Sequence, residues 1–323
     1  MKTLNEMMHP EYCEFCSFWR RIGAFIIDMF ILIILGFILS LVLGDFFSEI
    51  GAWGRFIGFT ISILYFGIMD SSISGGQTLG KMITKIRVVN ILGENVNVIR
   101  CVFRASIILV PFFLYGIMMP PSAFASAAMI VITFMFLSML VGLAYFYIFN
   151  VRTKQSFHDI AAGTYVVRKS MRGKLAKSEH VSRNVPVVHF IVYLALLAVI
   201  LAVSLFADYT VKKPFMEQGV SYQNVIRTNS AIMDYEEVYY STIITGKGNV
   251  AAVDSEVVYL EAAVYIYKRG LAGEENARKI RNVIMNTYAA APNLDYIEII
   301  FMHGFDIGIA SRWKGEAYQF VLK

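Results

Sequence analysis

Seven ionisable residues beside apolar segments are the strongest candidates for chemistry in this sequence. They are Arg21, Asp28, Asp70, Lys81, Arg104, His158 and Asp159. Arg21 and Asp28 are seven positions apart, so a helix places them on one face with Asp28 roughly 10 Å further along. A carboxylate near the centre of a bilayer costs about 2–3 kcal/mol and faces a partner or a polar cavity. Asp28 is therefore either an ion or proton site, or a structural ion pair with Arg21 or with a basic residue of a neighbouring helix.

The composition identifies the solvent around these residues. Of the 323 residues, 57% are hydrophobic and only 16% are charged, and the mean hydropathy is +0.58. An average soluble domain carries about 25% charged residues. Seven Pro and three Cys exclude collagen-like and disulfide-rich classes. The composition predicts a membrane protein.

The lengths of the apolar segments predict five membrane spans, since a spanning helix needs about 20 mostly apolar residues. The spans are expected at about residues 22–43, 51–69, 104–120, 126–150 and 185–207. Pro120 and Pro121 separate the third span from the fourth, because adjacent prolines interrupt a helix. A basic linker, residues 171–184, precedes the fifth span. The expected fold is an α-helical transmembrane bundle followed by a small α+β domain at residues 208–323.

The distribution of charge predicts the orientation. Residues 1–207 hold 17 Lys and Arg against 10 Asp and Glu, whereas residues 208–323 hold 12 against 14. The basic residues fall on alternate loops, as the positive-inside rule requires, which argues against nucleic-acid binding. We therefore expect a multi-pass protein of a prokaryotic plasma membrane, with residues 1–20 in the cytoplasm and residues 208–323 outside it.

Residues 208–323 have the alternation typical of strands and one amphipathic helix. The helix is expected at Glu274–Tyr288, where Ala277, Ile280 and Ile284 form one apolar stripe. Strands are expected at Tyr235–Thr245, Val257–Tyr267, Asp295–Met302, Ile307–Trp313 and Ala317–Leu322, with a turn at residues 303–306. This order favours an α+β domain with an antiparallel sheet.

Four segments together resemble the RDD family of multi-pass membrane proteins. They are Phe18–Asp28 (FWRRIGAFIID), Asp70–Ser72, Gly76–Val89 with the later Arg104, and Gln155–Val167 (QSFHDIAAGTYVV). The resemblance covers about residues 17–169, and residues 208–323 lie outside it. The Arg and two Asp of the family name correspond to Arg21, Asp28 and Asp159. The resemblance implies a small helical bundle and, as attributed to some members, transport that includes sodium/proton exchange.

Asp28 is expected deeper in the first span, whereas the other six ionisable residues fall at the cytoplasmic level of the bundle. We expect them to form a polar cluster at its inner mouth, which serves either as a scaffold for the loops or as a solute gate. The loop Gly75–Asn97 alternates apolar and basic residues, so it either lies on the membrane surface or forms a hairpin that turns at Gly93.

Other chemistries are weakly indicated. Gly75–Lys81 matches part of a phosphate-binding loop, but Met82 stands where that loop needs Ser or Thr. Cys13 and Cys16 with His9 offer at most three metal ligands, and a structural zinc site normally needs four. The sequence shows no nucleophile with a neighbouring base, so we expect no enzyme, no catalytic residue, no metal and no cofactor.

Two functions remain. The first is a transporter or exchanger of a small cation or solute that uses Asp28, and five spans are few enough that it would act as a homo-oligomer in the lipid bilayer. The alternative is a membrane-anchored binding or assembly protein whose outer domain engages a protein partner in the cell envelope.

Overall fold

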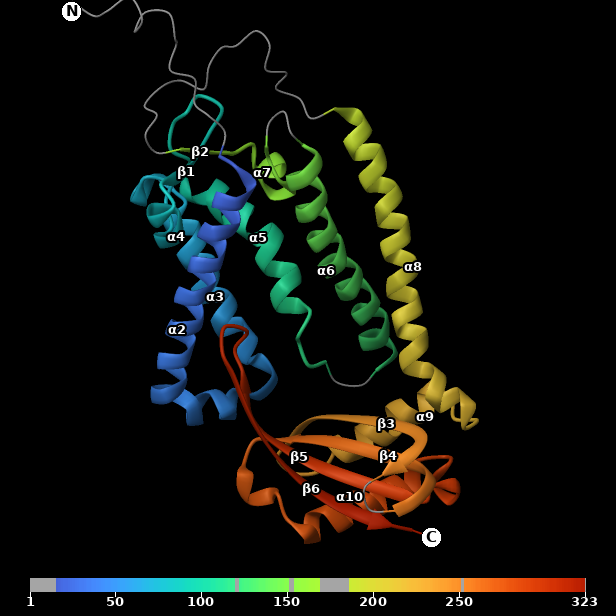
Figure 1. Ribbon diagram of the computed structural model, residues 1–323. Helices are drawn as coiled ribbons and strands as arrows, with labels where there is room; N and C mark the ends of the chain where they lie inside the picture. Colours follow the sequence, from blue (N-terminus) through green and yellow to red (C-terminus); the bar gives the residue numbers. More distant parts are fainter. Residues whose placement is uncertain (1–15, 120–121, 151–153, 169–185, 251–252, 323) are drawn as a thin grey trace, which may run out of the picture. The chain divides into compact units, whose positions relative to one another are not determined.

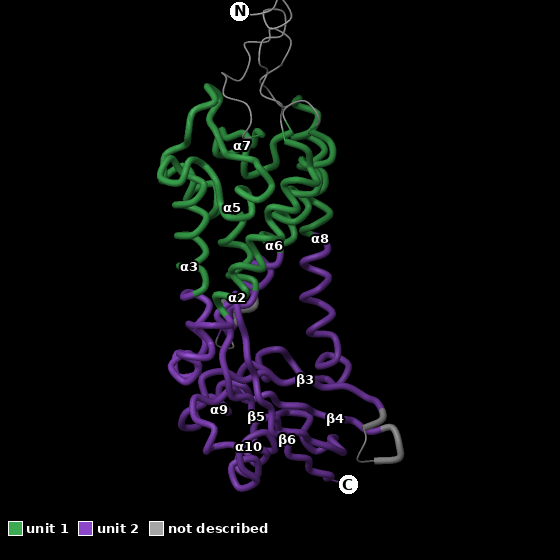
Figure 2. Tube along the Cα trace, turned by 60° about the vertical axis from the view of Figure 1, so that its left-hand side comes forward, with its two compact units in different colours: residues 1–36, 58–115, 134–201 green, residues 37–57, 116–133, 202–323 purple. Residues whose placement is uncertain are grey.

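Two compact units make up the described part of the chain. The computed structural model describes residues 16–119, 122–150, 154–168, 186–250 and 253–322. The first unit takes its residues from 1–36, 58–115 and 134–201, and the second from 37–57, 116–133 and 202–323 (Figure 2). Long helices contribute to both units, so each unit is assembled from segments distant in sequence.

The first unit is a helical bundle. Its long helices are α2 (Phe18–Ile50), α3 (Gly54–Met69), α5 (Val98–Leu114), α6 (Ala123–Phe149) and α8 (Val187–Glu217). Helix α5 lies entirely in the first unit, whereas one end of each of the other four belongs to the second unit. The chain descends through α2, turns in the 3₁₀ helix η1 (Gly51–Trp53) and returns in α3 (Figure 1). Gly51 has a φ of 59°, a conformation that glycine adopts without steric cost. This turn brings the start of α2 beside the end of α3.

Three helical segments of the described chain are long and apolar enough to cross a membrane: Phe18–Met69, Ala127–Phe149 and Val187–Glu217. They agree with a helical membrane part. The first contains two of the expected spans. The expected span 104–120 corresponds to α5, which has only 17 residues and starts at Val98. The count of five spans is therefore not confirmed. The Pro120–Pro121 boundary and the linker 171–184 lie outside the described residues.

Short elements close one end of the bundle. They are α4 (Leu79–Ile83), β1 (Ile86–Val89), α7 (Phe157–Ala162) and β2 (Tyr165–Arg168). β1 pairs antiparallel with β2, Val88 opposite Val166, rather than with a strand beyond Gly93. The hairpin that turns at Gly93, one of the two alternatives that the sequence left open for this loop, is therefore not formed by β1. Ile86, Val88 and Val166 are buried, so apolar contact with the bundle selects the distant partner.

The second unit contains a four-stranded sheet in the order β3-β4-β5-β6. Its elements are α9 (Tyr222–Met233), β3 (Val238–Val250), β4 (Val253–Ile266), α10 (Glu274–Thr287), β5 (Tyr296–Asp306) and β6 (Ser311–Val321). Side chains of α9 and α10 form one core with Leu260, Ala262 and Ile299 of the sheet. The expectation of a C-terminal α+β domain is confirmed, and α10 occupies nearly the expected range.

The sheet differs from the expected one in two respects. β4 and β5 run parallel, because α10 carries the chain back across one face of the sheet before β5 begins. The turn between β5 and β6 lies at residues 307–310 rather than 303–306. The side chain of Asp306 accepts a hydrogen bond from the N–H of Gly308 at 2.7 Å, and Gly308 has a φ of 78°. The expected strands Ile307–Trp313 and Ala317–Leu322 therefore merge into the single strand β6.

Candidate functional site

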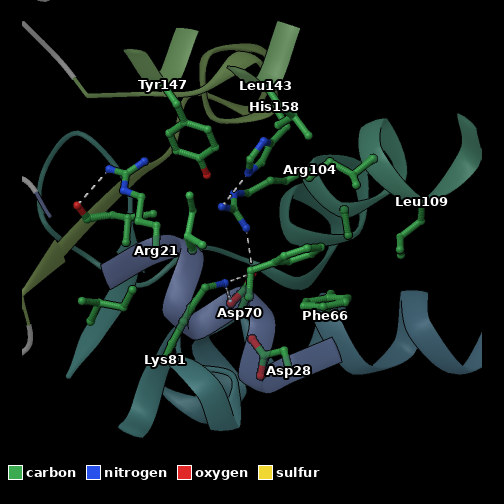
Figure 3. A pocket seen from close by; sticks show the side chains of 16 residues that line it. Arg21, Asp28, Phe66, Asp70, Lys81, Arg104, Leu109, Leu143, Tyr147 and His158 are labelled. Atoms are coloured by element: carbon green, nitrogen blue, oxygen red, sulfur yellow. Dashed lines mark hydrogen bonds and ion pairs between the residues drawn. The ribbon is translucent and has the colours of Figure 1, made fainter. Parts of the chain in front are cut away.

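All seven ionisable residues singled out by the sequence lie in the first unit, and Figure 3 labels all of them except Asp159. Arg21 and Asp28 come from α2, Asp70 follows α3, Lys81 lies in α4, Arg104 in α5, and His158 and Asp159 in α7. Six of these residues are buried, and the Lys81 side chain is 11% exposed. Five separate segments therefore bring three basic groups, three carboxylates and one imidazole to the same end of the bundle.

Arg104 is the centre of the cluster. Its Nε donates to Asp159 Oδ1 at 2.8 Å, and its Nη1 donates to Asp70 Oδ2 at 2.7 Å. Its Nη2 lies 2.9 Å from Nε2 of His158. A planar guanidinium presents its donors in a fixed fork, so Arg104 holds α5, α7 and the end of α3 in one arrangement.

Asp159 joins two arginines. Arg21 Nη1 donates to Asp159 Oδ2 at 2.9 Å, opposite the oxygen that Arg104 contacts. The first turn of α7 fixes this carboxylate, because Ser156 and Asp159 form a capping box. Burial by itself raises the pKa of Asp159, but the neighbouring Arg104, His158 and Arg21 hold that pKa well below its usual range. Asp159 is thus a carboxylate whose charge is fully paired.

Asp70 is paired in the same way. Nζ of Lys81 donates to both carboxylate oxygens of Asp70, at 2.6 Å to Oδ2, and Arg104 contacts Oδ2 as well. Burial lowers the pKa of Lys81, and the charge of Asp70 opposes this effect. Lys81 thereby ties α4 to the end of α3.

Asp28 differs from the other two carboxylates. Tyr65 Oη donates to its Oδ1 at 2.7 Å, the N–H of Gly80 donates to Oδ1 at 2.8 Å, and Thr78 Oγ1 donates to Oδ2 at 2.6 Å. All three donors are neutral. Within the described residues no ion pair involves Asp28, and Arg21 is paired with Asp159 instead. The ion pair between Arg21 and Asp28, one of the two alternatives that the spacing left open, does not form.

A cavity of about 150 Å³ lies among these side chains. The close-up in Figure 3 shows Asp28, Lys81 and Arg104 bordering it. Arg21, Asp70 and His158 also line it, and the rest of the wall is mainly apolar side chains of α2, α3, α5 and α6 such as Phe25, Phe66, Leu109 and Leu143. Asp159 is not part of the lining. The cavity therefore has a charged end and an apolar body.

Several residues of the site had no clear signal in the sequence. Tyr147 lines the cavity but lies within an uninterrupted apolar run. Tyr65 binds Asp28 from an equally apolar segment. Thr78 had a local signal, because a Thr before a helical turn is a common N-cap, and its side chain does accept a hydrogen bond from the N–H of Lys81.

The weak metal candidates gain no support. Cys16 is buried, and its thiol lies 3.4 Å from the carbonyl of Ser17, while Cys13 and His9 lie outside the described residues. The part of the chain that the structure describes contains no group of three or more His, Cys, Asp or Glu that could hold a metal ion.

These features define an integral membrane protein with a buried charge cluster at one end of its helices and a separate α+β unit. Residues 15–163 match the model of the RDD family. The chain thus carries an RDD family domain, which confirms the resemblance seen in the sequence, and Arg21, Asp28 and Asp159 all lie within the matched residues. No curated protein and no solved structure matches the chain.

Proposed function

We propose that the RDD family domain is a cation-binding transport unit in which Asp28 is the ion-coupled carboxylate. The observation that supports this proposal is the contrast among the three buried carboxylates. Asp70 and Asp159 each contact basic side chains within 3.0 Å. Asp28 contacts only neutral donors and borders the cavity.

The coordination of Asp28 leaves room for one ligand. A carboxylate has roughly four lone-pair sites, and three hydrogen bonds occupy three of them, two on Oδ1 and one on Oδ2. The second site of Oδ2 is available to a proton or to a small cation in the cavity. A hard cation such as sodium takes oxygen ligands, and the hydroxyl groups of Tyr65 and Thr78, which contact Asp28, are two further oxygen ligands beside it. Proton and cation would compete for the same oxygen, as exchange requires.

The paired charges give this site a rigid frame. Arg21, Arg104 and Lys81 pair with Asp70 and Asp159, so the only buried carboxylate without an ion pair among the described residues is Asp28. An incoming monovalent cation would compensate a buried charge, which is a large electrostatic gain in a medium of low dielectric constant. The cluster then acts as a scaffold, and Asp28 is the group that gains and loses a proton or a cation.

The test is cation-dependent proton movement in inverted membrane vesicles or proteoliposomes. Wild-type protein should dissipate a preset pH gradient when sodium, potassium or lithium is added, and Asp28→Asn should abolish the response. Asp45→Asn is the matched control, because Asp45 is an exposed carboxylate at the other end of the same helix. Unchanged exchange in Asp28→Asn, or no response of the wild type to any of these cations, contradicts the proposal.

A partner for residues 208–323 is the second candidate. Helices α9 and α10 cover one face of the sheet, while Glu261, Ala263 and Ile300, which share the opposite face by register, are only partly buried. A partly exposed sheet face is suited to a protein partner in the envelope. Crosslinking of the full-length protein in intact cells with photoreactive groups at Glu261 and Ile300 tests this proposal. Adducts that form at these positions and not at Arg278, a 62% exposed position of α10, would support it.

A further inference from the structure

The short helix α4 is held directly against α2. A Cβ atom added to Gly80 would collide with the backbone carbonyl of Ala24 and lie 2.9 Å from the carboxylate of Asp28. Only glycine permits this approach. The N–H of Gly80 and the hydroxyl of Thr78 both donate to Asp28, and the N–H of Leu79 donates to Tyr65 Oη at 3.3 Å. Helix α4 is therefore fixed by short contacts at the level of Ala24 and Asp28.

That level lies inside a membrane-spanning segment. Helix α2 begins the candidate span Phe18–Met69. With a rise of 1.5 Å per residue, Ala24 and Asp28 lie about 9 and 15 Å from Phe18 along the helix axis. On its outer surface α2 exposes Ile26 by 47% and Phe30 by 62% at the same depth. Apolar side chains exposed on a span face lipid, so the surroundings of α4 at this depth are apolar.

The outward face of α4 matches such surroundings. Leu79, Met82 and Ile83 are 41%, 38% and 65% exposed, and their spacing of i, i+3 and i+4 places them on one helical face. Ile73, four residues after the end of α3, is 69% exposed. An exposed apolar face of this kind is unfavourable in water, and it is favourable in the acyl region of a bilayer.

Exposed basic residues lie at one end of this face. The methyl group of Thr84 lies 4.0 Å from the position that a Cβ atom of Gly23 would take. Lys85, the next residue and an exposed one, therefore lies near the level of Gly23 along α2. Arg20, also exposed, is one turn before Gly23 on α2. Both residues are thus closer to the start of α2 than the apolar face of α4 is. Long basic side chains at the end of a span extend to the headgroup region and attract anionic lipid.

We propose that residues 73–85 form a re-entrant interfacial element: α4 inserts its Leu79–Met82–Ile83 face into the acyl region of one leaflet, and Lys85 with Arg20 binds the phosphate of anionic phospholipids. The occupant of this surface is the bilayer itself. The assignment rests on the depth at which α4 is attached to α2, and it is independent of whether Asp28 exchanges cations.

The first experiment measures depth. Spin labels are placed at Ile83→Cys, Phe30→Cys and Glu94→Cys in a background with Cys13, Cys16 and Cys101 replaced by Ser, and the full chain is reconstituted in phosphatidylcholine vesicles. Phe30 is an exposed residue of α2, and Glu94 is exposed in the turn after β1. The collision rate of the label at position 83 should be higher with oxygen, which concentrates in the acyl region, than with a water-soluble nickel complex. The label at position 30 should show the same preference. A label at position 83 that resembles position 94 overturns the proposal, and so does one shielded from both reagents, which would indicate a protein partner.

The second experiment tests the headgroup contact. Phosphatidylglycerol added to phosphatidylcholine should raise the thermal stability of the wild-type protein, and Arg20→Gln with Lys85→Gln should remove most of that increase. Lys247→Gln, which changes an exposed lysine of β3, is the matched control and should keep it. If the double variant responds to phosphatidylglycerol as the wild type does, these two residues do not bind the lipid headgroup. High salt should reduce the wild-type response, since exposed charges are screened.

Discussion

The RDD family domain and the C-terminal α+β unit differ in where their ion pairs lie. In the C-terminal unit, apolar residues of α9, α10 and the sheet form one buried cluster. The ion pairs on α10 are exposed, such as Arg278 with Glu274, whose side chains are 62% and 65% exposed. In the RDD domain, ion pairs are buried together with apolar residues. Arg104, Asp159 and Asp70 are buried, and large apolar residues such as Phe30 are exposed.

The comparison shows how each unit depends on its solvent. In water, burial of apolar surface drives folding, and exposed ion pairs add about 1 kcal/mol or less. Between helices in lipid this apolar driving force is absent, and packing and polar contacts determine how the helices associate. We infer that the charge cluster around Arg104 has the role in the RDD domain that the apolar core has in the C-terminal unit. Three predictions test this inference.

The largest effect is expected for Arg104→Leu. Removal of one partner from a buried ion pair costs about 3–5 kcal/mol, because the other charge is left uncompensated. Here each of two buried carboxylates loses one of its two basic partners. Thermal denaturation in detergent should show a strongly lowered midpoint, and hydrogen exchange should rise in α7 and β2. Arg104→Lys should recover only part of the loss, since an ammonium cannot contact Asp70, Asp159 and His158 in the same geometry. A midpoint equal to that of the wild type contradicts the proposed role of the cluster.

The next effect is expected for Ile280→Ala in the C-terminal unit. Ile280 of α10 is 1% exposed, and its truncation should cost about 2–5 kcal/mol through lost contacts and the cavity left behind. Hydrogen exchange of the full chain should increase in α10 and β4 and stay unchanged in α7 and β2. Met285→Ala on the same helix, 38% exposed, is the control and should cost about 0.5 kcal/mol or less. Increased exchange throughout the RDD domain after Ile280→Ala would show that the two units do not unfold separately.

The sequence predicted the periodic elements well and the pairings between them poorly. Ala277, Ile280 and Ile284 recur at helical spacing, and the structure places them on the buried face of α10. The parallel pairing of β4 with β5 and the pairing of β1 with β2 depend on contacts between residues distant in the chain. Local spacing contains no information on such contacts. Helix α9 was not predicted at all, although Ser221 caps it in the usual way.

The candidate site shows the same division. Charge within apolar segments was enough to single out the seven ionisable residues, since an isolated charge there is costly. Which of them form pairs could not be predicted, because Asp28 lies on the same face of α2 as Arg21 yet binds Tyr65, Thr78 and Gly80. Two of these donors are neutral hydroxyl groups and one is a backbone N–H. Such groups occur throughout the chain, so nothing in the sequence marks these three as partners of Asp28.

The smallest of the three effects is expected for His158, and its prediction depends on the protonation state of the imidazole. Arg104 Nη2 carries hydrogens and lies 2.9 Å from His158 Nε2, so Nε2 acts as the acceptor of this hydrogen bond. The other ring nitrogen, Nδ1, then carries the proton and donates to Ser156 Oγ at 2.7 Å. This assignment follows from the hydrogen-bond network. A second proton on the ring would break the bond to Arg104 and add a positive charge beside it.

Lowering the pH should therefore destabilise the RDD domain before its carboxylates titrate. Burial, reinforced by Arg104, Lys81 and Arg21 against the opposing charge of Asp159, lowers the pKa of His158 to about 3. The histidine of the unfolded state has a pKa of about 6.5, so below that pH the unfolded state binds more protons than the folded state. The contribution of His158 to the free energy of unfolding is therefore fully present above about pH 6.5. It falls by up to about 1.4 kcal/mol per pH unit towards pH 3. Asp159 adds to the loss only below about pH 4, where an unfolded aspartate is protonated. Denaturation midpoints in detergent should decrease between about pH 6 and 5 in the wild type and stay level in His158→Gln, whose amide oxygen can still accept from Arg104 at every pH. Equal slopes in the two proteins would mean that His158 is not held neutral by the cluster.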